Sequence, residues 1–139
     1  MRRRASILTV VAGVAAALAV AGCTTAGTSS SPKLTGDAKA VAKVVDDLAS
    51  AGRRKDPQKI CTQLLAPALV DRLKAGGGDC VTEIKKAIDD SDDFDLQVRS
   101  VRVTGNTAQA QVRQGSKGAV TTFAFAKQGG GWRATSLGG

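Results

Sequence analysis

The hydrophobic pattern of the chain changes near residue 95, from helical periodicity before that point to strict alternation after it. In the first predicted helix, from Asp37 to about Arg54, the apolar residues follow the spacing i, i+3, i+4, i+7 of one helix face: Val41, Val44, Val45 and Leu48. Thr35 or Asp37 is suited to cap the start of this helix, and Gly52 marks its end. The pattern therefore predicts an amphipathic helix with one buried face.

Two further helical segments follow, and each has a recognisable start. Asp56 and Pro57 place a capping carboxylate before a proline at the first helical position. Pro67 breaks or restarts the segment, which ends at the glycines of 76–78. Asp79 is a candidate cap for the next helix, which ends near Asp89. The predicted core residues of these segments are Ile60, Cys61, Leu64, Leu65, Leu69, Val70, Leu73, Val81, Ile84 and Ile88.

Beyond Asp95 apolar and polar residues alternate, which is typical of strands with one buried face. Turn sequences at 105–106, 114–118 and 129–131 divide this region into four strands. The alternation slips by one residue near Arg99 and Ser100, which predicts a β-bulge and a bent strand. In the other three strands, the residues predicted to face the core are Ala108, Ala110, Val112, Thr121, Phe123, Phe125, Trp132, Ala134 and Ser136.

Helices followed by a meander of strands predict a single α+β domain over residues 37–139. We expect the N-terminal helices to pack on one face of a curved four-stranded antiparallel sheet. The chain has 139 residues, which leaves room for one small domain and no second one of ordinary size.

The first 22 residues have the architecture of an export signal. Three arginines at 2–4 precede 18 uncharged residues that are mostly Ala, Val and Leu. Ala21 and Gly22, both small, then precede Cys23. A retained transmembrane helix is an alternative, but 18 residues are at the short edge for spanning a bilayer. Ordinary cleaved secretion without an anchor is a second alternative.

The segment from Val20 to Cys23 resembles the lipobox of bacterial lipoproteins. This resemblance implies that a diacylglycerol is attached to the sulfur of Cys23 and that the signal, residues 1–22, is removed. The protein would then be anchored to the cell membrane on its extracytoplasmic face, since two or three acyl chains suffice for stable anchoring. Residues 23–36 are rich in Thr, Ser and Gly, and they predict a flexible tether.

In a compartment outside the cytoplasm, we expect Cys61 and Cys80 to form a structural disulfide. Closing a loop of about 20 residues stabilises a domain by roughly 3 kcal/mol in the chain-entropy model. The pair lacks the C-x-x-C spacing of redox sites, and no histidine is present to complete a metal site. Two buried free thiols remain the alternative.

Composition narrows the possible chemistry. The chain contains neither histidine nor tyrosine, which excludes His-based catalysis, His-ligated metals and Tyr acid chemistry. We therefore expect a protein that is not an enzyme, with no metal or other cofactor. The remaining enzymatic alternative would use Asp and Arg chemistry. Loss of the signal also lowers the net charge from +8 to +5, because three of the 20 basic residues are removed.

Charged residues are segregated along the chain. Five carboxylates occur within seven residues: Asp89, Asp90, Asp92, Asp93 and Asp95. A divalent-cation loop is one interpretation, but the spacing of an EF-hand is missing, and a solvated loop is favoured. Residues 99–139 have six basic side chains and no acid: Arg99, Arg102, Arg113, Lys117, Lys127 and Arg133. These residues suit a solvent-facing sheet or an anionic partner such as lipid headgroups or wall polymer. Scarce aromatics and the compartment argue against nucleic acid.

The order of these features resembles small actinobacterial lipoproteins with a nuclear-transport-factor-2-like domain. The resemblance rests on the helix up to Arg54, the two cysteines, the hairpin Val101-Arg-Val-Thr-Gly-Asn-Thr-Ala108 and the terminal Gly131-Trp-Arg133. It implies a cone-shaped fold, often with a hydrophobic pocket at the open end. Enzymes on this fold typically use Asp, Tyr or His, so the resemblance assigns no catalytic residue here.

Three aromatic residues are candidates to line such a pocket: Phe123, Phe125 and Trp132. At alternate strand positions such residues are more often part of a simple core, and this interpretation is favoured. We expect a non-enzymatic module that binds an envelope protein or another partner at the cell envelope. Carriage of a small apolar ligand in the pocket is the alternative.

Overall fold

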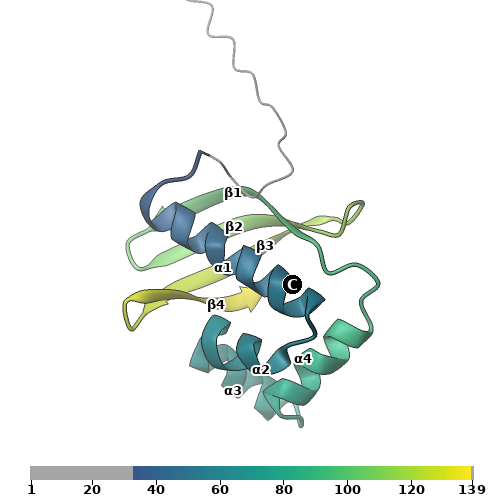
Figure 1. Ribbon diagram of the computed structural model, residues 1–139. Coiled ribbons are helices and arrows are strands. Elements are labelled where there is room, and N and C mark those ends of the chain that lie inside the picture. Colours follow the sequence, from purple (N-terminus) through teal and green to yellow (C-terminus); the bar gives the residue numbers. More distant parts are fainter. Residues whose placement is uncertain (1–32, 139) are drawn as a thin grey trace, which may run out of the picture.

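The computed structural model describes residues 33–138 and shows helices followed by a four-stranded sheet (Figure 1). The predicted signal peptide, the lipidation site Cys23 and most of the tether lie outside these residues. The helical elements are α1 (Gly36–Arg53), α2 (Pro57–Lys59), the π-helical turn η1 (Ile60–Leu64), α3 (Pro67–Ala75) and α4 (Cys80–Asp89). The strands are β1 (Leu96–Thr104), β2 (Thr107–Gln114), β3 (Val120–Gln128) and β4 (Gly131–Leu137).

The strands pair antiparallel in the order β1-β2-β3-β4, and the helices pack on the sheet, so the predicted α+β class is confirmed. Figure 1 shows α1 lying across the sheet, with the shorter helices grouped beyond β4. Between residues 33 and 138, no helix combines the length and the apolar character needed to cross a membrane.

Helix α1 buries the predicted apolar face against the sheet. Its four predicted core residues are all buried, together with the small residues of the same face, Ala42, Ala49, Ala51 and Gly52. Thr35, one of the two predicted candidates, is the N-cap residue, but its side chain makes no capping hydrogen bond, and the Asp37 carboxylate bonds to other elements. The Asp37 carboxylate accepts hydrogen bonds from Trp132 Nε1 and Lys127 Nζ, both at 3.0 Å. These contacts connect the start of α1 to β3 and β4.

The pKa of Asp37 is lowered by the hydrogen bond from Trp132 and then by the one from Lys127. Because the folded-state pKa lies below the unfolded value, the contribution of Asp37 to stability is present at neutral pH. It is lost as the pH falls through the folded-state pKa.

The second helical segment leaves regular α geometry earlier than its sequence suggests. Asp56 caps α2 as predicted, accepting a hydrogen bond from Lys59 N at 2.9 Å. The backbone N–H of Leu65 then bonds to Ile60 O at 3.0 Å, which is the wider π spacing. Leu65 bridges to Ala134 of β4, and Ala66 N donates to Ala134 O at 2.8 Å. The wider turn therefore ends in a short extended segment that pairs with the edge of the sheet.

The β4 edge is protected further by two arginines. Arg133 donates to the carbonyl oxygens of Thr62 and Leu65 at 3.0 and 3.4 Å, and Arg72 of α3 donates to Thr135 O. Such covering blocks unwanted strand pairing at an edge.

The four strands and the turns between them lie where the alternation predicts them. The bulge predicted near Arg99 lies between Val98 and Ser100, and a second, unpredicted irregularity in β4 falls at Thr135. Most of the strand residues predicted to face the core are buried, namely Ala108, Ala110, Val112, Phe123, Phe125, Trp132 and Ala134. Thr121 and Ser136, at the ends of the same face, are half-buried.

Candidate functional site

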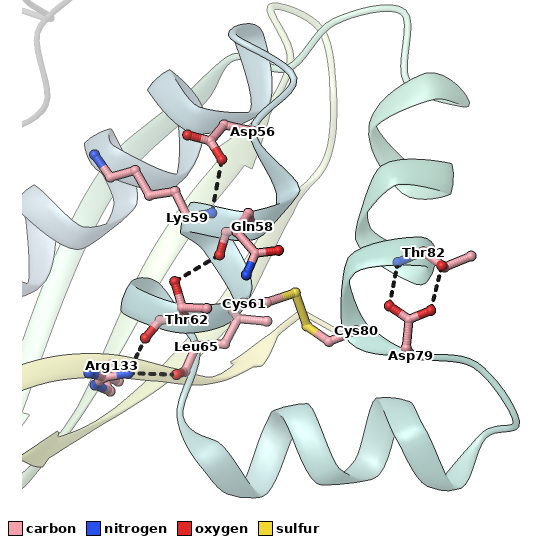
Figure 2. Close-up of a disulfide and its surroundings, with 10 residues drawn as sticks. All are labelled: Asp56, Gln58, Lys59, Cys61, Thr62, Leu65, Asp79, Cys80, Thr82 and Arg133. Atoms are coloured by element: carbon pink, nitrogen blue, oxygen red, sulfur yellow. Dashed lines mark hydrogen bonds between the residues drawn. A yellow bond between two sulfur atoms is a disulfide. The ribbon is translucent and has the colours of Figure 1, made fainter.

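A disulfide joins Cys61 of η1 to Cys80, the first residue of α4, as Figure 2 shows. The two Cα atoms are 6.1 Å apart and the cysteines are separated by 19 positions. Both cysteines belong to the hydrophobic core. The disulfide therefore connects α4 to η1, the turn whose following residue Leu65 pairs with β4.

The start of α4 is also capped beside the bridge. Asp79 accepts hydrogen bonds from the backbone N–H and the hydroxyl of Thr82, as predicted for a capping carboxylate (Figure 2). The hydrogen bond from the Thr82 hydroxyl is the main cause that lowers the pKa of Asp79, and the one from the Thr82 backbone N–H lowers it further. The bridge and the cap together hold the first turn of α4 in place.

A cavity of about 370 Å³ lies between α1, η1, α4 and the sheet. Most of its wall is apolar and comes from Leu48, Ile60, Ile84, Ala87, Phe94, Leu96, Phe123 and Leu137. Four polar residues complete the lining: Asp90, Ser91, Asp93 and Gln114. All four are exposed, so the cavity opens toward the loop between α4 and β1.

The predicted pocket residues are divided between this cavity and the core. Phe123 contributes to the cavity wall. Phe125 and Trp132 do not line this cavity. Like Phe123 they are buried in the hydrophobic core, and Trp132 Nε1 donates to the Asp37 carboxylate. Sequence reasoning missed Phe94, a lone aromatic residue inside the acidic run 89–95. The signal available in the sequence was that Phe94 is the one apolar residue among the acidic residues of 89–95.

Phe94 is positioned by a glycine of α1. A methyl group at Gly52 would overlap the Phe94 ring, so only a residue without a side chain leaves room for it. Gly52, predicted to end the helix, lies within its last turn and is buried. The glycine therefore lets the ring lie directly on the helix backbone while it forms part of the cavity wall.

The loop that carries Phe94 is tied to the turn between β2 and β3. The Asp93 carboxylate accepts hydrogen bonds from Asp95 N at 3.0 Å and Ser116 N at 3.1 Å. Gly115 N donates to Asp95 O at 2.7 Å. Asp93 thus joins the cavity rim to the turn between β2 and β3 by accepting hydrogen bonds from backbone N–H groups.

The clustered carboxylates have different partners. Asp89 pairs with Lys85 at 2.7 Å and Lys55 at 3.4 Å, and these two lysines, in that order, lower its pKa. Asp95 pairs with Arg53 at 3.1 Å. In the part of the chain that the structure describes, no three acidic or cysteine side chains converge in a way that could hold a metal ion.

The sheet face opposite α1 carries a second, shallow hollow of about 350 Å³. Its side-chain lining includes Arg102, Thr104, Thr107, Gln109 and Thr135, around the short side chains of Ala124 and Ala126. Two of the six basic residues of this half are engaged within the domain, because Lys127 bonds to Asp37 and Arg133 to backbone carbonyls. Arg102 lines this hollow, and both Arg99 and Arg102 are exposed.

No protein-family model, curated protein or solved structure matches this chain. The fold and the cavity therefore describe a class only: a small disulfide-bonded α+β domain with an apolar cavity beneath one loop.

Proposed function

We propose that the protein is a non-enzymatic binding module that holds a small apolar molecule in the cavity between α1, α4 and the sheet. The observation that carries this proposal is the cavity itself. Its volume of about 370 Å³ lies at the lower end of the range of small-molecule sites. An apolar wall with a few polar groups at the opening is also typical of such sites.

The alternative roles have less support. A protein-interaction module would be favoured by an exposed apolar patch, but Val120, at 45% exposed, stands alone as an exposed large hydrophobic residue between 33 and 138. An enzyme would be favoured by a carboxylate deep in the cavity. The central carboxylates of α1 do not take that position, since Asp46 is exposed and Asp47 pairs with the exposed Lys43 at 2.7 Å.

Occlusion of the cavity mouth tests the proposed binding. Ala87 lines the cavity yet is exposed, so Ala87→Phe should fill the opening without disturbing the core. We expect this variant to bind the neutral fluorescent probe N-phenylnaphthylamine at least about tenfold more weakly than the parent protein does, as measured by fluorescence titration. Ala40→Phe, on the exposed side of α1, is the matched control and should bind like the parent. Equal binding by all three proteins would contradict a ligand site in this cavity.

We also propose that the module is a lipoprotein of the cell membrane, exposed on the extracytoplasmic side. Support comes from the lipobox-like segment before Cys23, from the polar tether and from the disulfide, which is typical of compartments outside the cytoplasm. The resemblance to actinobacterial lipoproteins with a nuclear-transport-factor-2-like domain agrees with this location.

Replacement of Cys23 by alanine tests the anchor. Cys23→Ala should remove the acyl groups and move the protein from the membrane fraction to the soluble fraction of the producing cell. Intact-mass spectrometry of the parent should show a chain that begins at Cys23 and carries a diacylglycerol. Thr24→Ala, one residue further on, should leave both the mass increment and the fractionation unchanged. A parent protein that retains residues 1–22, or that lacks lipid, would contradict the proposal.

A further inference from the structure

We infer that the cavity takes a cationic amphiphile, a small molecule with an apolar body and an ammonium group at one end. This inference rests on the proposed function, because it specifies the ligand of the same cavity. The charges around the cavity opening support this inference, whereas the apolar wall of the cavity supports the proposed function.

The composition of the cavity lining favours a cationic ligand. The cavity is lined by two carboxylates, Asp90 and Asp93, and by no lysine or arginine. The protein as a whole is basic, with 20 Lys and Arg against 12 Asp and Glu. An opening with only negative charges is therefore a local departure from the overall balance, and it disfavours an anionic ligand.

The carboxylates of the loop differ in whether a cationic side chain neutralises them. Asp89 and Asp95, which do not line the cavity, have lysine or arginine partners. Neither Asp90 nor Asp93 has a cationic partner within residues 33–138, and the Asp93 carboxylate accepts its hydrogen bonds from backbone N–H groups. Asp90, Asp92 and Asp93 are thus the loop carboxylates without a cationic partner in the described residues, and two of these three lie at the opening, where a ligand cation would lie.

The apolar and aromatic residues behind the rim favour a ligand with an apolar body. Leu48, Ile60 and Ile84 supply an aliphatic wall for the body of the ligand. The rings of Phe94 and Phe123 line the same space, and Phe94 comes from the loop that carries both carboxylates. An ammonium group attracts aromatic faces as well as carboxylates, so the site is suited to a cation joined to an apolar body.

Three probes with the same alkyl chain test the inference: decylammonium, decanol and decyl sulfate, each below its micelle concentration. Isothermal titration at low ionic strength should rank decylammonium tightest, about tenfold above decanol, with decyl sulfate the weakest. The advantage of decylammonium should shrink in high salt, because the rim is exposed to solvent.

Asp90→Asn should reduce the affinity for decylammonium about fivefold and change the affinity for decanol by much less, because decanol has no charge. Asp92→Asn is the matched control, since Asp92 lies in the same loop, is exposed and does not line the cavity. It should leave the ranking of the probes intact. If decanol binds as tightly as decylammonium, or if decyl sulfate binds most tightly, the inference on charge is overturned while the apolar site stands. If none of the three probes binds, the proposed function fails with it.

Discussion

The double variant Cys61→Ala/Cys80→Ala is expected to lose about 3 kcal/mol of unfolding free energy, because the unfolded chain is no longer constrained by a closed loop. The cysteines are 19 positions apart, so the loop is long enough for this entropy to be substantial. For a domain of this size the loss corresponds to a fall in Tm of roughly 15 °C. Urea denaturation and calorimetry of the domain without its lipid would measure both quantities.

The single variants distinguish a bridge from two buried thiols. If the disulfide is present, Cys61→Ala and Cys80→Ala should each be about as destabilising as the double variant, since either change opens the loop. Two independent thiols would instead give small effects that add. Reductant provides the matching control: it should lower the Tm of the parent and leave that of the double variant unchanged. Additive single effects and an insensitive parent would contradict the disulfide.

Much of the fold could be predicted because its elements are specified locally. The apolar face of α1, the capping residues Asp56 and Asp79, and the alternation along the strands all act through near neighbours in the sequence. The bulge at Arg99 was visible for the same reason, since the alternation itself slips there. Where local signals agreed, the structure followed them.

The rest depends on contacts between distant residues, which one sequence does not display. The carboxylate of Asp37 suits a helix cap, yet it binds Trp132 and Lys127 across 90 or more positions. Pro67 predicts a break in the helix at this point, but it does not show that Leu65 and Ala66 pair with Ala134 of β4. In both cases the partner is distant in the sequence, so the contact cannot be predicted from neighbouring residues.

The candidate site was predicted only in part for a related reason. The alternating pattern singles out three aromatic residues of the strands. The wall of the cavity, however, is formed by residues from every element that surrounds it. Phe123 shares this wall with a loop residue, Phe94, and with residues of three helical elements. Which acidic residues keep an uncompensated charge also depends on distant cations such as Arg53 and Lys55. The charge pattern of the opening therefore appears only in the folded chain.

Gly52→Ala is expected to destabilise the domain by about 2 kcal/mol, although alanine normally favours a helix over glycine by about 1 kcal/mol. The reason is that the new methyl group would occupy the space of the Phe94 ring. The ring would have to leave the helix surface, and overpacking of this kind typically costs 1–3 kcal/mol. Since Phe94 also lines the cavity, the binding of an apolar probe should weaken in the same variant.

A double-mutant cycle isolates this cause. In a Phe94→Ala background the space above Gly52 is free, so adding Gly52→Ala should be neutral or stabilising, by up to about 1 kcal/mol. The sign of the Gly52→Ala effect thus depends on whether the ring is present, which a general loss of helix quality would not produce. Urea denaturation of the four proteins measures the coupling. An equal loss of stability in both backgrounds would mean that Phe94 does not lie on Gly52, and the cavity wall described above would then be wrong at the loop that carries its two carboxylates.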